Sequence, residues 1–167
     1  MPAILTFPAW AVARRCQNTS MTTKHAPGRR RSTKKPFSYR AAILFHDVDP
    51  AGTAYYPRLV DLCHCAFENF FNTRIGTPYS KVISGGVGFP TVRFEVDFVS
   101  PIRHGDQIDI EVRVLEVGRT SVTLGYVARR GRTVLYRARN VMVVVDLATM
   151  TKKPLRGVMR EKFLAAL

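Results

Sequence analysis

The segment FHDVDPAGTAYYP, residues 45–57, places a carboxylate in a turn directly before an amphipathic run. Gly52 allows a tight turn and Pro50 fixes a backbone angle, so Asp49 is held near the amino end of the helix that this run predicts. Unpaired amides at a helix start can hold a carbonyl oxygen as it becomes negative, and a nearby carboxylate can activate water or attack the carbonyl carbon. The combination suits acyl transfer. The alternative is that Asp49 only caps the turn, since Asp before Pro and Gly is common in loops.

Asp47 is a second acid in the same segment. In an extended chain, residues two apart face the same way, so repulsion between Asp47 and Asp49 would hinder full ionisation of both. We expect Asp47 to be structural and Asp49 to be the reactive acid. His46, immediately before, can serve either in proton transfer or as a structural hydrogen-bonding group.

Residues 57–74 show helical spacing, with Pro57 suited to the first helical position and Gly76 to the end. The predicted helix has five turns and a length of roughly 27 Å at 1.5 Å per residue. An apolar 3-4 repeat and a narrower polar stripe run along it: Leu59, Cys63, Ala66, Phe67 and Phe70 against Arg58, Asp61, His64 or Cys65, Glu68 and Asn72. The many apolar positions indicate a mostly buried helix.

Strand patterns surround this helix in the sequence. KPFSYRAAILF predicts a first strand before it, and four strands follow after a looser stretch, SKVISGGVGFP. Apolar and polar residues alternate in TVRFEVDFV and QIDIEVRVLEV, and TVLYRARNVMVVVDL reads as a long final strand. One antiparallel sheet wrapped around the helix is the economical way to bury it, which predicts an α+β fold.

The length of 167 residues, 46% of them apolar, is suited to one domain, which we place at residues 37–167. The net charge of +14 belongs largely to the preceding segment, because residues 1–40 hold nine Lys/Arg and no acid. We expect residues 1–36 to be a disordered basic tail. This tail either attaches weakly to an anionic surface or is simply a solvated segment. Nucleic-acid binding is not favoured. Met21 is an alternative translation start to Met1.

No apolar run reaches the roughly 20 residues that a membrane span needs. The first arginines follow the apolar amino-terminal stretch, the reverse of a secretory signal, so a cytoplasmic protein is expected. The cysteines are odd in number, and Cys63 and Cys65 point in different directions on a helix, which suits neither a disulfide nor a metal pair. We expect three reduced thiols and no metal site.

The stretch DVDPAGTAYYPRLVD, followed by FPTVRFEVDFVSPIRHGDQIDIEVRVLEVGRTSVTL, closely resembles the hot-dog-fold acyl-CoA thioesterases of the 4-hydroxybenzoyl-CoA thioesterase type. The resemblance spans about residues 37 to 155. It implies a hot-dog fold, in which a five-stranded antiparallel sheet wraps a long central helix. It also implies a homodimer whose sheets join edge to edge, with sites at the dimer interface, or a homotetramer of two such dimers.

Three candidate catalytic residues follow from this resemblance. The catalytic acid of the family falls on Asp49, and the helix-start position whose N–H polarises the thioester carbonyl falls on Tyr56. His64 departs from the family pattern, since relatives usually carry Glu, Asp or Asn there. It can assist proton transfer to the leaving thiolate or act as a structural hydrogen-bonding group.

The resemblance also implies substrate-binding residues. Arg119, Thr120 and Ser121 fall where the family binds the phosphates of CoA, although a turn is also where a solvated surface arginine is common. Phe89 with Pro90 falls where relatives border the acyl pocket. No cofactor is expected, because CoA is part of the substrate.

The expected activity is hydrolysis of an aromatic or short acyl-CoA to a carboxylic acid and CoA, with Asp49 as general base or nucleophile. One alternative keeps the fold but takes its thioester from an acyl carrier protein, whose acidic surface the arginine-rich turn at residues 129–132 would suit. A second is a non-catalytic binding module whose basic tail contacts nucleic acid.

Overall fold

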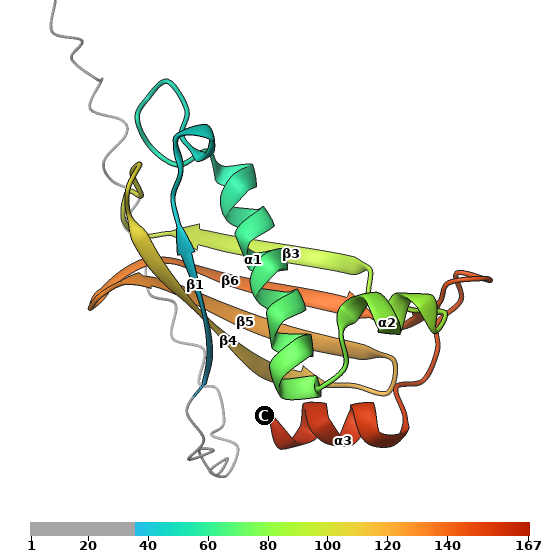
Figure 1. Ribbon diagram of the computed structural model, residues 1–167. Coiled ribbons are helices and arrows are strands. Elements are labelled where there is room, and N and C mark those ends of the chain that lie inside the picture. The colour runs from blue at the N-terminus through green and yellow to red at the C-terminus, as the bar shows by residue number, and fades with distance from the viewer. Residues whose placement is uncertain (1–35) are drawn as a thin grey trace, which may run out of the picture. The chain divides into compact units, whose positions relative to one another are not determined.

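The computed structural model describes residues 36–167 (Figure 1). Its main feature is a five-stranded sheet in the order β1-β4-β5-β6-β3, in which all neighbours are antiparallel. The strands are β1 (Phe37–Ala42), β3 (Thr91–Phe98), β4 (Gln107–Val117), β5 (Ser121–Arg130) and β6 (Thr133–Val143). All five strands were predicted from the sequence, β3 and β4 from their alternation of apolar and polar residues.

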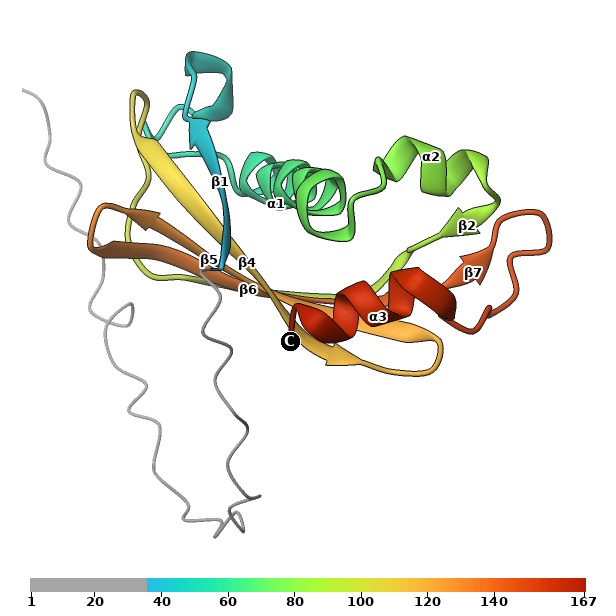
Figure 2. The same cartoon turned by 60° about the horizontal axis from the view of Figure 1, so that its bottom comes forward.

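The long helix crosses one face of this sheet, as Figures 1 and 2 both show. It consists of α1 (Tyr56–Phe70) and a π-helical turn, η3 (Phe71–Ile75). Gly76 ends it in the left-handed conformation, with φ of 68°, which a glycine adopts without steric cost. The buried residues of α1 are the five of the predicted apolar repeat: Leu59, Cys63, Ala66, Phe67 and Phe70.

The sheet has an inner face toward α1 and an outer face. In β4, for example, Ile108, Ile110, Val112 and Val114 are buried, whereas the alternating residues are more exposed. Period-2 patterning on the strands and a 3-4 repeat on the helix therefore bury one shared core. The predicted hot-dog fold is confirmed.

Two short helices and a small ribbon were not predicted. They are α2 (Tyr79–Ser84), α3 (Gly157–Ala165) and the pair β2 (Val87–Gly88) with β7 (Val145–Asp146). The stretch predicted as one long final strand is divided in two. Its first part is β6, which ends at Val143, and its last part is β7. α3 buries only Phe163, whose ring packs against those of Phe70 and Phe71.

The proposed basic tail lies outside the described residues, apart from its last position, so its disorder stays a prediction. Within residues 36–167, no helix is long and apolar enough to cross a membrane. Cys63 and Cys65 are free thiols, as expected, while Cys16 lies outside the described part.

Candidate active site

The Asp49 turn is closed by three backbone-directed hydrogen bonds. The Asp49 amide donates to the Thr53 carbonyl at 2.9 Å, and the Gly52 amide donates to the Asp49 carbonyl at 2.9 Å. The Ala51 amide donates to Asp49 Oδ1 at 2.9 Å, while Oδ2 accepts no hydrogen bond from any of residues 36–167. Gly52 has φ of 74°, which explains why this position needs glycine. The turn thus fixes the carboxylate and leaves one oxygen open.

Asp47 anchors this turn to the helix. Its side chain is only 7% exposed and accepts hydrogen bonds from the Leu44 amide at 2.8 Å and from Arg58 Nε at 3.0 Å. His46 Nε2 lies 3.3 Å from the same carboxylate. The Asp47 carbonyl accepts from the Tyr55 amide at 2.7 Å, so side chain and backbone together tie the turn to the start of α1.

The expected hindrance to ionisation does not hold for Asp47. Burial opposes its charge, but the Leu44 amide, Arg58 and His46 outweigh burial and lower the pKa of Asp47 below its ordinary value. The reason is local conformation, because Phe45–Asp47 forms a 3-10 turn and not the extended chain that the expectation assumed.

The start of α1 presents an available amide beside this turn. Tyr55 caps the helix with an extended backbone, Tyr56 is its first residue, and Pro57 has no N–H. The Tyr56 N–H precedes the first intrahelical hydrogen bond and has no acceptor among residues 36–167. Tyr55 and Tyr56 are 48% and 61% exposed. One short segment therefore contains both a carboxylate with an open oxygen and an unpaired amide at the start of a helix.

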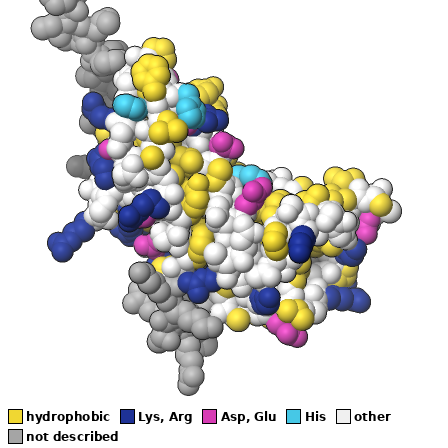
Figure 3. Space-filling view, in the orientation of Figure 1, with side chains coloured by type: hydrophobic (Ala, Val, Ile, Leu, Met, Phe, Trp, Pro, Cys, Tyr) yellow, Lys and Arg dark blue, Asp and Glu magenta, His cyan; other side chains and the backbone are white. Residues whose placement is uncertain are grey.

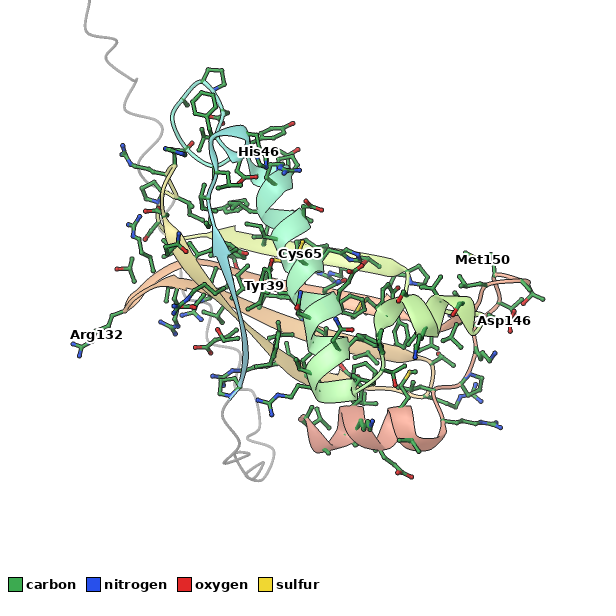
Figure 4. All side chains as sticks on the ribbon, in the orientation of Figure 1. Tyr39, His46, Cys65, Arg132, Asp146 and Met150 are labelled. Atoms are coloured by element: carbon green, nitrogen blue, oxygen red, sulfur yellow. The ribbon has the colours of Figure 1, made fainter. Side chains whose placement is uncertain are left out.

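An exposed apolar surface surrounds this segment. Leu44 and Phe45 are 51% and 79% exposed, and the Phe45 ring packs edge-on against His104. Figure 3 shows hydrophobic and histidine side chains gathered at this end of the molecule, and Figure 4 places His46 beside the start of α1.

His64 lies two turns further along α1, about 12 Å from Tyr56 by the rise of a helix. Its Nε2 is 3.1 Å from Glu68 Oε1, and both side chains are at least half exposed. The ring also packs against Phe67 and Tyr79. His64 is therefore oriented by its neighbours but does not reach the Asp49 turn within one chain.

The predicted CoA-binding turn joins β4 to β5. The Gly118 amide donates to the Ser121 carbonyl at 2.9 Å, and a side chain at Gly118 would come within 2.5 Å of Ser121 Oγ. The Thr120 carbonyl accepts from the Val144 amide, and the Arg119 carbonyl from the Leu155 amide. Arg119 itself is exposed and makes no ion pair with any of residues 36–167.

A hollow of about 390 Å³ adjoins this turn, and the sequence did not reveal it. It is lined by Val87, Val144, Lys153, Pro154, Leu155, Arg156 and Met159. The lining joins residues from opposite sides of β6 in the sequence, so no local pattern could have indicated it. An apolar hollow with cations on its wall and Arg119 nearby can hold an anionic ligand that has an apolar part.

Phe89 and Pro90 precede β3 at this same end of the sheet. Phe89 is buried, and its ring packs against those of Phe71, Tyr79 and Phe163. The Pro90 carbonyl accepts from the Val143 amide at 3.0 Å.

The structure thus separates the predicted site residues into two groups. Asp49 and Tyr56 lie near the far end of β3, because the Ala54 amide donates to the Ile102 carbonyl just beyond that strand. Pro90 and the turn at 118–121 lie at its beginning. The length of β3 keeps the groups roughly 25 Å apart, so one chain does not bring them into one site.

The buried thiol in the helix is not a candidate nucleophile. Cys63 donates to Tyr136 Oη at 3.5 Å, and burial raises the pKa of this thiol to about 11. Residues 36–167 contain no group of three or more His, Cys, Asp or Glu side chains that could hold a metal.

Comparison with known proteins supports the chemistry suggested by the Asp49 segment. Residues 43–163 match the family described as the thioesterase-like superfamily. A 1,4-dihydroxy-2-naphthoyl-CoA hydrolase of Synechococcus elongatus is 26% identical over 121 residues, which cover 71% of this chain and 88% of that protein.

Solved structures share the fold. A 1,4-dihydroxy-2-naphthoyl-CoA thioesterase from Synechocystis matches with a TM-score of 0.71 and 22% identity, covering 78% of this chain and 96% of the other. A gentisyl-coenzyme A thioesterase matches with a TM-score of 0.69 and 24% identity, covering 74% and 99%. The expectation of a thioester hydrolase is confirmed at the level of the family. Since the family match covers most of the sequence and nearly all of the described fold, the chain belongs to the thioesterase-like superfamily.

Proposed function

We propose that this chain hydrolyses the thioester bond of an aromatic acyl-CoA, giving a free carboxylic acid and CoA. The observation that carries the proposal is the Asp49 turn, which holds a carboxylate with one open oxygen in the same short segment as the unpaired Tyr56 amide. The same two features are those a thioester hydrolase needs, namely a base or nucleophile and a donor for the developing oxyanion.

The reaction places the thioester carbonyl oxygen at the Tyr56 N–H, at the positive end of α1. Asp49 then removes a proton from water, which attacks the carbonyl carbon, and the C–S bond breaks as CoA thiolate leaves and takes up a proton. In the other route Asp49 attacks the carbon itself, forming an anhydride that water hydrolyses. Both routes consume one water and release one acid and one thiol.

Two observations favour an aromatic acyl group. One relative is a 1,4-dihydroxy-2-naphthoyl-CoA hydrolase, and one protein of the same fold is a gentisyl-coenzyme A thioesterase. In this chain, a series of edge-on and tilted rings leads from the exposed side of α1 into the core, through His64, Phe67, Tyr79 and Phe89. Aromatic surfaces favour edge-to-face or offset contacts with a further ring.

The CoA moiety is proposed to lie at the turn of Arg119, Thr120 and Ser121 and in the adjoining hollow. Arg119 is exposed and is available for a phosphate, and Arg156 lines the hollow. Lys153 is less available because its Nζ lies 3.1 Å from Asp146 Oδ2.

An acyl carrier protein donor has less support. Of the arginines in the hairpin between β5 and β6, Arg130 pairs with Asp106 and Arg129 with Glu111. Only Arg132 extends away from the sheet (Figure 4). Membership of a hydrolase family likewise favours catalysis over a binding module.

A panel of acyl-CoA thioesters assayed with a free-thiol reagent tests the function. Benzoyl-, hydroxybenzoyl- and dihydroxynaphthoyl-CoA should be hydrolysed with higher kcat/KM than acetyl- and hexanoyl-CoA. Asp49→Asn provides the control for background hydrolysis. Activity only on thioesters of an acyl carrier protein would contradict the CoA assignment, and inactivity toward the whole panel would contradict the proposal.

A further inference from the structure

Three consecutive carbonyls of the turn between β4 and β5 are held by the part of the chain that follows β6. The Val144 amide donates to the Thr120 carbonyl at 2.8 Å, and the Leu155 amide donates to the Arg119 carbonyl at 2.9 Å. Figures 1 and 2 both show α3, which continues this part of the chain, beside the turn. These two donors are main-chain groups, which every residue except proline supplies.

The third carbonyl depends on one side chain. Arg160, on α3, donates from Nη1 to the Gly118 carbonyl at 2.6 Å. Arg160 is half-buried and makes no ion pair with any of residues 36–167. The Gly118 carbonyl has no other donor in that part of the chain. The first peptide group of the turn is therefore held by a side chain that lies 42 residues further along the sequence.

The orientation of these peptide groups determines what the turn offers to an anion. A trans peptide group carries its C=O and its N–H on opposite sides. Because the carbonyls of Gly118 and Arg119 are held by the C-terminal segment, the N–H groups of Arg119 and Thr120 point the other way. Neither N–H has an acceptor among residues 36–167. Successive free N–H groups in a turn are donors for an anion such as a phosphate.

We propose that Arg160 is a positioning residue for CoA, because its hydrogen bond to the Gly118 carbonyl keeps the Arg119 N–H turned toward a phosphate. Without this hydrogen bond, the peptide group between Gly118 and Arg119 is free to rotate, since glycine has no Cβ to restrict its backbone. Its carbonyl oxygen would then face the phosphate and repel it. The inference rests on the proposed function, in which this turn binds CoA.

The same helix contains a matched control. Lys162 Nζ donates to the Ile75 carbonyl at 2.5 Å, at the end of the long helix. Like Arg160, Lys162 is a half-buried cation of α3 that binds a main-chain carbonyl. Its acceptor belongs to η3 and not to the turn. Lys162→Met should therefore remove a comparable contact of α3 without changing the binding of CoA.

Steady-state kinetics test the positioning role. Arg160→Met keeps the length of the side chain and removes its donors. KM for an aromatic acyl-CoA should rise at least about fivefold with kcat within about twofold, because the phosphates bind alike in the ground and transition states. Hydrolysis of the matching acyl-N-acetylcysteamine, which lacks the phosphates, should be unchanged, and this also shows that the variant is folded.

Two further variants complete the kinetic test. Arg160→Lys retains a donor for the Gly118 carbonyl and should keep KM within about threefold of wild type. Lys162→Met should leave KM unchanged. An unchanged KM in Arg160→Met, or an equal rise in Lys162→Met, would overturn the proposal.

Hydrogen exchange in the free protein separates positioning from direct contact with a phosphate. The Gly118 amide donates to the Ser121 carbonyl at 2.9 Å, so its exchange rate reports how often the turn opens. Without ligand, Arg160→Met should speed this exchange at least about threefold, because the turn loses one of its ties, whereas Lys162→Met should not. A raised KM with unchanged exchange would show that Arg160 contacts the phosphate itself and would overturn the positioning role.

Calorimetry with CoA separates this inference from the proposed hydrolysis. Arg160→Met should bind CoA at least about fivefold more weakly than wild type, whether or not any thioester is hydrolysed. An inactive wild type that binds CoA with this dependence on Arg160 would refute the proposed function and support the inference. A wild type that hydrolyses acyl-CoA, with equal CoA affinity in Arg160→Met, would overturn the inference alone. A wild type that does not bind CoA would overturn both.

Discussion

Replacing Asp47 by Asn tests the anchor of the Asp49 turn. Asp47 accepts two charge-assisted hydrogen bonds, from the Leu44 amide and from Arg58, and each such bond contributes about 1.5–3 kcal/mol. The Asn side chain can still accept an uncharged hydrogen bond from the Leu44 amide, and Arg58 keeps its ion pair with Asp61, at 3.5 Å. We therefore expect a loss of about 2 kcal/mol in the free energy of unfolding, measured from urea midpoints at one fixed protein concentration.

Asp109→Asn is the matched control, because Asp109 also accepts two bonds from an arginine, Arg40, at 2.8 and 3.1 Å. That pair is exposed, so its loss should cost less than about 1 kcal/mol. Equal losses for Asp47→Asn and Asp109→Asn would refute the reasoning from burial.

The difference in free energy of unfolding between wild type and Asp47→Asn should also depend on pH. The folded pKa of Asp47 is lowered, so its contribution is fully present above the unfolded value of about 3.9 and is lost as pH falls through the folded value. The gap between wild type and Asp47→Asn should therefore narrow in acid. A constant gap from pH 7 down to the acid transition would contradict the lowered pKa.

Three further predictions concern activity. Asp49→Asn should lower kcat at least about a hundredfold without changing the fold seen by circular dichroism, since loss of a general base costs roughly 10² to 10⁴. Arg119→Ala should raise KM for acyl-CoA about ten- to a hundredfold with kcat little changed, and should hydrolyse an acyl-N-acetylcysteamine as wild type does, because that thioester lacks the phosphates. Deleting residues 1–35 should leave turnover nearly unchanged; loss of all function would favour a binding module.

The sequence predicted the elements that have strong periodicity. The 3-4 repeat of apolar residues in α1 predicted its five buried residues, and the alternation of apolar and polar residues predicted strands such as β4 to within a few residues. The helix starts one residue before the expected Pro57, which remains within its first turn. Which face of a helix or strand is buried follows from the spacing of its apolar residues, and this spacing can be read from a sequence.

Elements held by tertiary contacts were not visible. α2 has only six residues, too few for a periodic signal, and α3 contributes a single buried side chain, Phe163. Phe163 is fixed by rings from residues as distant as Phe70 and Phe89, so its position depends on packing and not on neighbouring sequence. The hollow beside the turn at 118–121 was missed for the same reason.

The candidate site follows the same division between local and distant information. The turn around Asp49 could be predicted because Pro50 and Gly52 act on their own neighbours. Asp47 was expected to be structural, but its partners and its lowered pKa could not be predicted, because its carboxylate is positioned by Arg58, eleven residues later, through a 3-10 turn that has no periodic pattern.

The separation of Asp49 from Arg119 by the length of β3 is a second feature that local sequence information could not predict. Residue spacing along one chain cannot indicate which groups a second chain supplies, yet antiparallel pairing about a two-fold axis exchanges the two ends of β3. The edge-to-edge homodimer that the resemblance implies is therefore the arrangement expected to bring Asp49 and the turn at 118–121 together.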